Sequence, residues 1–335
     1  MDNLQVQSPK IIVRMPNWLG DSIMALPVLQ YLKYKWPKAH LSVCIPAAQR
    51  PIFELLKDVD RIFTHSKNAY KELRKENFNL GLLLTNSFSS AWHFWRSKIK
   101  TRVGYAADCR SFLLSKAIKK AKNRESRHLV EVYQELAHSI DSSHEPQPLF
   151  QPKIEVPDDA IQNMQLFLEK EKVPSKKIIC IHPAAAYGPA KCWLKDRLLL
   201  LSEKLLKDES LCIVYVGDQK AKKQIDPLAI DHPRVFNFAG KTNLLELIAL
   251  LKLSKVLLSN DSGPMHLADA LGTKVLALFG STNPAKTRPY NIGQVIYKKA
   301  SCSPCYLRKC PIDFRCMKAI EVNEVFEQIQ AMYSH

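Results

Sequence analysis

The sequence lacks several features that mark familiar protein classes. No apolar run reaches the roughly 18 residues that a membrane span needs, and the segment Met1–Lys10 has no apolar core like that of a secretory signal. No G-x-G-x-x-G motif follows a strand and no G-x-x-x-x-G-K motif occurs, which argues against dehydrogenases and P-loop enzymes. No clear D-x-D metal motif ends a predicted strand. We therefore expect a soluble, cytoplasmic protein.

The composition is that of a globular protein with an excess of positive charge. The 335 residues are 46% hydrophobic and 24% charged, which suits two domains with their own cores. The net charge of +17 indicates an acidic partner: nucleic acid, an anionic membrane or a phosphorylated substrate. From Trp92 to Arg127, eleven Lys or Arg face only Asp108 and Glu125, a net charge of +9. A solvated basic face is the alternative interpretation.

Strand-like and helix-like segments alternate in both halves of the chain, which predicts two parallel sheets with crossover helices. In the first half, the expected strands are 10–15, 41–45, 61–64 and 80–85, and the expected helices are 22–36, 51–57 and 69–76. In the second half, the expected strands are 177–182, 211–216, 255–259 and 274–279, and the expected helices are 193–208, 243–252, 264–271 and 320–333.

A proline-rich segment separates the halves. Glu145–Pro157 has four prolines in thirteen residues, which no helix or central strand tolerates. We expect an N-terminal acceptor-binding domain over 1–150 and a linker and interdomain segment over 151–175. A nucleotide-sugar-binding domain is expected over 176–318, and a C-terminal helix over 319–335 that packs back on the N-terminal domain.

The segment Ser259–His266 follows a predicted strand and contains a candidate phosphate site. Gly263 allows a close approach of the backbone, and the next proline suits the first position of a helix. Such a turn presents free N–H groups and a positive dipole end to a pyrophosphate. Asp261 or Ser262 could instead serve only as an N-cap, but a cap does not require His266 one turn later.

Two further loops carry candidate chemistry. In Asn17–Asp21, after the first strand, Asp21 is either an N-cap or a general base that takes a proton from a sugar hydroxyl. In the loop that follows His182, Lys191 is a compact cation suited to a diphosphate leaving group. A lysine in a loop is more often simply solvated, and His182 is equally well explained as a satisfied core histidine.

Taken together, the segments resemble the family 9 glycosyltransferases, the lipopolysaccharide heptosyltransferases. The matching segments are 17–21, 86–89, 104–105, 183–193, 260–266 and 279–284, in this order and across nearly the whole chain. Residues 86–88 and 187–191 resemble the type II branch more than the type I branch. The resemblance implies a GT-B fold, an α/β architecture of two Rossmann-like domains with a cleft between them.

The resemblance also implies a reaction: inverting, metal-independent transfer of L-glycero-D-manno-heptose from ADP-heptose to the first heptose of the lipopolysaccharide inner core, with no cofactor required. Asp21 would activate the acceptor hydroxyl and Lys191 would hold the diphosphate. The implied donor-binding residues are Gly217, Asp261, Ser262, Gly263 and His266, and the implied acceptor-binding residues are Asn86, Ser87 and Arg102.

One position departs from the family pattern. Type I enzymes are expected to carry a glutamate near the ribose, just after the glycine that matches Gly217, whereas this chain has Asp218, Gln219 and Lys220. The roles of Asp218 and Lys220 stay open.

The implied acceptor is a phosphorylated lipid in the inner leaflet. The basic stretch 92–127 would hold it and dock the enzyme on the inner face of the inner membrane. The expected partners are thus ADP-heptose, the phosphorylated inner core and that membrane surface, but no nucleic acid.

Four cysteines cluster near the C-terminus: Cys302, Cys305, Cys310 and Cys316. They suggest a structural zinc site, although the second pair is spaced more widely than the usual C-x₂₋₄-C. Reduced or disulfide-paired structural cysteines and an iron–sulfur cluster are the alternatives. The proposed chemistry needs none of them.

Three other functions fit parts of the pattern. A family 9 transferase could use another nucleotide sugar or acceptor. The charge and the cysteines could belong to a nucleic-acid-binding protein, but no basic, aromatic-rich recognition element adjoins the cysteines. A sensor that binds a nucleotide sugar without turnover is excluded only if Asp21 is catalytic.

Overall fold

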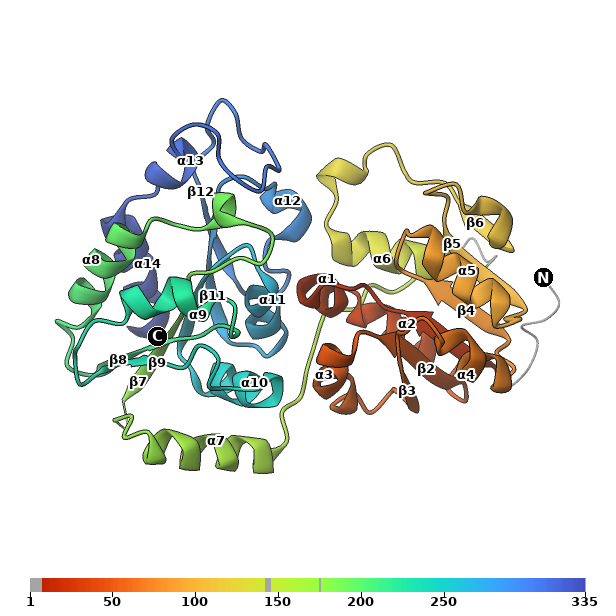
Figure 1. Ribbon diagram of the computed structural model, residues 1–335, viewed down its shortest axis with the longest axis horizontal. Helices are drawn as coiled ribbons and strands as arrows, with labels where there is room; N and C mark the ends of the chain where they lie inside the picture. The colour runs from red at the N-terminus through yellow and green to blue at the C-terminus, as the bar shows by residue number, and fades with distance from the viewer. Residues whose placement is uncertain (1–7, 142–145, 175, 335) are drawn as a thin grey trace. The chain divides into compact units, whose positions relative to one another are not determined.

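The protein consists of two compact units, Met1–Ile154 and Glu155–His335. They are described in a computed structural model, which covers residues 8–141, 146–174 and 176–334 (Figure 1). The start of the polar N-terminal segment and Glu145 of the proline-rich segment lie outside the described residues. Among the described residues, no helix combines the length and apolar character that crossing a membrane requires.

The first unit is built on a six-stranded parallel sheet with the order β3-β2-β1-β4-β5-β6. Its strands are β1 (Lys10–Arg14), β2 (His40–Ile45), β3 (Arg61–Thr64), β4 (Leu80–Leu83), β5 (Thr101–Tyr105) and β6 (Lys116–Ile118). The strand order reverses between β1 and β4. In open α/β sheets, ligands bind outside the carboxyl ends of the strands at such a reversal.

Helices cover both faces of this sheet. They are α1 (Leu19–Met24), α2 (Leu26–Lys35), α3 (Arg50–Glu54), α4 (Ala69–Lys75), α5 (Phe88–Arg96) and α6 (Leu129–His138), with short 3-10 turns η2 (Ala47–Gln49), η3 (Ser111–Leu113) and η4 (Arg124–Ser126). Leu73 of α4 and Phe94 of α5 pack on strand residues such as Ile12. On the opposite side, α6 packs against α1 and α2.

The second unit repeats the design with the order β12-β11-β10-β7-β8-β9, again all parallel. Its strands are β7 (Lys177–His182), β8 (Leu211–Tyr215), β9 (Val235–Asn237), β10 (Val256–Asn260), β11 (Lys274–Phe279) and β12 (Gln294–Tyr297). Here the order reverses between β7 and β10. The predicted α/β class with two Rossmann-like domains is therefore confirmed.

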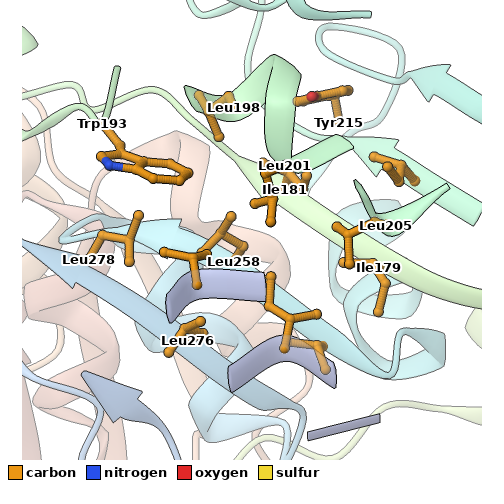
Figure 2. Packing of buried hydrophobic residues seen from close by; sticks show 14 of the residues in the cluster. Ile179, Ile181, Trp193, Leu198, Leu201, Leu205, Tyr215, Leu258, Leu276 and Leu278 are labelled. Atoms are coloured by element: carbon orange, nitrogen blue, oxygen red, sulfur yellow. The ribbon is translucent and has the colours of Figure 1, made fainter. Parts of the chain in front are cut away.

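The helices of the second unit are α7 (Asp158–Lys170), α8 (Lys195–Leu205), α9 (Lys222–Ile225), α10 (Leu244–Leu253), α11 (Gly263–Ala270), α12 (Pro284–Thr287), α13 (Arg315–Lys318) and α14 (Val322–Ser334). The main core of the unit lies between the sheet and α8 and α14. In Figure 2, Leu201 of α8 lies beside Ile181 of β7. Leu205 lies beside Ile179 in the same way.

Both ends of the second unit bear on the expected domain limits. Within the expected linker 151–175, residues 158–170 form α7, which packs on α10. Two aspartates in its first turn and a buried stripe through Met164 and Leu168 favour this helix. At the other end, α14 packs on α8 of its own unit. A contact of α14 with the N-terminal domain stays a prediction.

Candidate active site

The carboxyl edge of the second sheet gathers most of the predicted donor-binding residues. Asn260 ends β10, and α11 begins three residues later at Gly263. Ser262 is the N-cap of α11 but makes no capping bond with its side chain, because its hydroxyl lies 2.9 Å from Ser259 Oγ. The N-cap interpretation of Ser262 thus fails for its side chain. The Ser262 side chain therefore does not cap the first turn of α11, and a helix start of this kind is a common anion-binding position.

Lys191 pairs with Asp261 at this edge. Its Nζ lies 2.5 Å from Asp261 Oδ2, and the two side chains are 14% and 6% exposed. The same carboxylate oxygen accepts a 2.8 Å hydrogen bond from Thr282 Oγ1. The ammonium also lies 5.0 Å from the centre of the Tyr187 ring. Lys191 is therefore not a freely solvated lysine, because a buried carboxylate and an aromatic ring fix its position.

Asn260 joins the loops that carry this pair. Its Nδ2 donates to the Pro183 carbonyl at 2.7 Å, and its Oδ1 accepts from the Trp193 amide at 3.1 Å. The loop after β7 is thereby held against the end of β10. Gly188, in that loop, has φ of 152°, and a Cβ there would lie 2.3 Å from the Arg308 carbonyl oxygen. Only glycine fits this position, three residues before Lys191.

The two histidines of the predicted region are both buried, at 7% for His182 and 6% for His266. The Nδ1 of His182 lies 2.9 Å from the Val216 carbonyl, and desolvation by burial lowers its pKa. His182 is thus the satisfied core histidine of the alternative interpretation. His266 lies in the first turn of α11.

In the loop after β8, local contacts account for the residue types at Gly217 and Asp218. A Cβ on Gly217 would lie 2.7 Å from Ile225 Cδ1 and 2.9 Å from Ala221 Cβ, so the glycine lets α9 pack closely. Asp218 accepts a 2.8 Å hydrogen bond from the Ala221 amide at the start of that helix. Lys220 is exposed. A donor contact of Gly217 stays a prediction.

In the first unit, Asp21 lies in the first turn of α1, directly after the loop that leaves β1. Its Oδ1 accepts a 3.1 Å hydrogen bond from Tyr133 Oη of α6. The residue is partly exposed. A partly exposed carboxylate that a phenol holds in place suits a general base.

Buried polar side chains hold the loop that carries Asp21. Arg14, 2% exposed at the end of β1, reaches the Asn17 Oδ1 at 2.5 Å. Gln49 donates to the Asn17 carbonyl at 2.9 Å and accepts from Ser22 Oγ at 2.7 Å. Desolvation lowers the pKa of Arg14. These contacts fix the backbone on both sides of Asp21.

A histidine pair lies near Arg14. The rings of His65, after β3, and His93, on α5, are 5.6 Å apart. Burial, the charge of Arg14 and the partner ring lower the pKa of His65 to about 4, and burial followed by Arg14 also lowers the pKa of His93. Both rings are therefore neutral at physiological pH.

The predicted acceptor-binding residues have different environments. The buried Oδ1 of Asn86 has no hydrogen-bond partner within the described residues. The Ser87 hydroxyl caps α5 by accepting from the Ser90 amide. Arg102 donates to the carbonyls of Leu113, Ile99 and Lys100, so it braces the backbone around β5. Asn86 is the residue with free capacity for a ligand, and all three acceptor roles stay predictions.

A match to a protein-family model shows which family the chain belongs to. The model described as "Glycosyltransferase family 9 (heptosyltransferase)" matches residues 67–314, well over half of the sequence. The chain belongs to glycosyltransferase family 9. Its two Rossmann-like units are those of the GT-B fold, as the resemblance implied.

Individual proteins of similar sequence and structure are consistent with this family. The lipooligosaccharide heptosyltransferase 2 of Haemophilus ducreyi is 30% identical over 86% of this chain and 88% of its own length. The lipopolysaccharide heptosyltransferase 2 of Escherichia coli is 28% identical over 84% of this chain and 85% of its own length. The structure of the E. coli ADP-heptose lps heptosyltransferase II has a TM-score of 0.84, with 26% identity over 97% of this chain and 98% of that one.

The described residues give no support for a metal centre at the four C-terminal cysteines. They line one cavity of about 20 Å³, but no group of three or more His, Cys, Asp or Glu side chains in the described parts of this family 9 chain is placed to hold a metal ion. The predicted structural zinc site is therefore not supported. The four are free thiols, and burial raises the pKa of Cys316.

Three polar residues near the candidate site residues were not assigned a role from the sequence. Tyr133 and Thr282 contact Asp21 and Asp261. Tyr133 stands in no motif, and Thr282 lies in the matching segment 279–284 but was given no role there. Asp269, 3% exposed on α11, accepts four backbone N–H bonds of 2.7–3.2 Å from residues 290–293. The one sequence feature that could have indicated these bonds to the loop 290–293 is an isolated aspartate on an otherwise apolar helix face.

Proposed function

We propose that the protein transfers L-glycero-D-manno-heptose from ADP-heptose to the first heptose of the lipopolysaccharide inner core. The family match and the names of the relatives support a heptosyltransferase of this core. The observation that carries the proposal is the group at the carboxyl edge of the second sheet, where Lys191, Asp261 and the uncapped start of α11 lie together. Such a group suits a diphosphate.

The proposed reaction is a single displacement. Asp21 takes the proton of an acceptor hydroxyl, the resulting oxygen attacks the anomeric carbon, and the bond to ADP breaks with inversion. The ADP leaves as an anion, and Lys191 and the N–H groups of α11 stabilise its negative charge without a metal ion. Tyr133 is a positioning residue because it orients the Asp21 carboxylate.

The acceptor side is proposed to include Asn86, whose buried Oδ1 has no partner among the described residues. Because the acceptor is a lipid, the enzyme works at the inner face of the inner membrane. The positive charge of residues 92–127 supports this location.

The test is transfer between defined substrates. The protein is incubated with ADP-heptose and an inner core that carries one heptose, and released ADP and product mass are measured. A core without heptose and a panel of other nucleotide sugars are the controls. Faster release of the nucleoside diphosphate from another nucleotide sugar, or transfer to the heptose-free core, would overturn the assignment.

A matched pair of variants tests the base. Asp21→Asn should abolish transfer and leave ADP binding intact, because the base acts on the acceptor. Asp58→Asn removes an exposed carboxylate of the same unit and should keep full activity. Loss of ADP binding in Asp21→Asn would contradict the role.

A further inference from the structure

Helix α5 displays a row of large aromatic side chains to solvent. Phe88, Trp92 and Trp95 are 42%, 37% and 46% exposed, although the opposite side of the helix buries Phe94 fully. Phe112, in the turn η3, is 74% exposed and lies 6.1 Å from the Phe88 ring. Single exposed apolar residues are common, but a contiguous group of this size marks an interaction surface.

The rings form an ordered surface. The Phe88 and Trp92 rings are stacked at 6.4 Å, and the Trp92 and Trp95 rings are stacked at 5.0 Å. They therefore make one continuous apolar row from the start of α5 to its end. Figure 1 shows α5 beside β4 and β5 in the first unit. We call Phe88, Trp92, Trp95 and Phe112 the aromatic row.

Positive charge borders the row at the end of α5. A hollow of about 450 Å³ is lined by Trp95, Ile99 and four cations, namely Arg96, Lys98, Lys100 and Arg102. The segment 88–102 has no acidic residue, and within the described residues no carboxylate pairs with the first three of these cations. Because Arg102 is bonded to backbone carbonyls, Lys98 and Lys100 are the cations with most freedom to meet an anion.

We propose that the aromatic row and its basic border dock on an anionic lipid bilayer. Tryptophan rings favour the headgroup level of a membrane, where one part of the ring is apolar and the other is wet. Lys and Arg beside them gain from the negative potential of the lipid surface. A soluble acidic protein would match the charges but would give no reason for four exposed rings in a row.

This proposal rests on the proposed function, which gives a reason for the position of the aromatic row. The aromatic row begins directly after Asn86 and Ser87, the predicted acceptor-binding residues at the carboxyl edge of β4. A lipid whose tails stay in the bilayer thus has its sugars near the end of α5 that carries these residues. Stable membrane binding usually takes two kinds of attraction, and here the aromatic row provides the apolar one and its basic border the electrostatic one.

The test is flotation of the full chain with vesicles of phosphatidylcholine, alone or mixed with phosphatidylglycerol. We expect binding to the mixed vesicles that weakens as salt is added. Combining Trp92→Ser with Trp95→Ser should reduce the partition coefficient about tenfold or more, and Lys98→Gln with Lys100→Gln should reduce it by a similar factor. The control variant combines Tyr34→Ser with Lys38→Gln. It removes an exposed ring on α2 and an exposed lysine shortly after that helix.

Activity separates docking from substrate binding. The tryptophan variant should keep wild-type turnover on a deacylated, water-soluble acceptor and lose turnover on the same acceptor in mixed vesicles. Equal binding to both kinds of vesicle, equal loss in the control variant, or lost turnover on the soluble acceptor would overturn the docking surface. If the wild type fails on the soluble acceptor but floats with mixed vesicles, the proposed reaction fails and the docking surface stands.

Discussion

The Lys191–Asp261 pair should be a strongly coupled element of the second unit. Lys191→Met removes the ammonium and keeps most of the aliphatic chain, so Asp261 stays buried at 6% exposure with the Thr282 hydroxyl as its remaining contact from this cluster. Removal of one partner from a buried ion pair costs about 3–5 kcal/mol of unfolding free energy. We expect about 3 kcal/mol, because the lysine is 14% exposed and the site admits some water.

The reverse change should be milder. In Asp261→Asn the long Lys191 side chain can turn toward solvent, so the expected loss is only about 1–2 kcal/mol. With both changes no charge stays buried, and the double variant should lose at least about 2 kcal/mol less than the sum of the single losses.

Trp193 offers a local readout of these losses. It is the one tryptophan of the second unit, it is 4% exposed, and its amide donates to Asn260, the neighbour of Asp261. Urea unfolding followed by the fluorine signal of 5-fluorotryptophan at this position would report on the second unit alone. Additive losses, within about 0.5 kcal/mol, would refute the coupling.

The same samples test the donor role. ADP that binds the folded state raises its stability by RT ln(1 + [ADP]/Kd). This increment should shrink markedly in Lys191→Met, because the ammonium no longer meets the diphosphate. An unchanged increment would remove Lys191 from the donor site while leaving the ion-pair argument intact.

Three further predictions concern single side chains. Tyr133→Phe should lower kcat about tenfold with little change in KM, as initial rates would show, because Asp21 loses its 3.1 Å hydrogen bond. The wild type should lose stability between about pH 6.5 and pH 4, and His65→Gln should make this loss about 1–2 kcal/mol smaller in urea unfolding. The reason is that the pKa of His65 is lowered in the folded chain, so in this pH range the unfolded chain binds a proton on the ring and the folded chain does not. The effect is kept small because the ring is only half-buried and its charge interactions are screened. Gly188→Ala should cost about 2–3 kcal/mol in urea melts, since its Cβ would meet the Arg308 carbonyl, whereas Gly272→Ala, with open space, should cost only about 1 kcal/mol of backbone strain.

The helices and strands that could be predicted are those with a clear hydrophobic period. The expected helix 243–252 is α10 shifted by one residue, since its leucines and its Asn243 cap define it. The expected helix 22–36 is instead two helices, α1 and α2, with a break at Ala25. A proline in the first turn of α2 starts the second helix and cannot continue the first.

The candidate site was predictable where function resides in loops after strands. Lys191 and Asp261 were both predicted at the donor site from two different loops, and strand order brings those loops together because β7 and β10 are neighbours at the reversal. Tyr133 could not be predicted, since its meeting with Asp21 depends on how α6 packs against α1. Sequence spacing contains no information on such contacts between distant segments.

The bonds of Asp269 restrict how this chain can be altered. Four consecutive N–H groups of residues 290–293 converge on a single buried carboxylate. An added residue there would pull at least one donor out of range, and the buried charge would lose part of its shell. An affinity tag, a fluorescent insert or a new chain terminus therefore belongs in another surface loop, although 290–293 looks like an ordinary turn in the printed sequence.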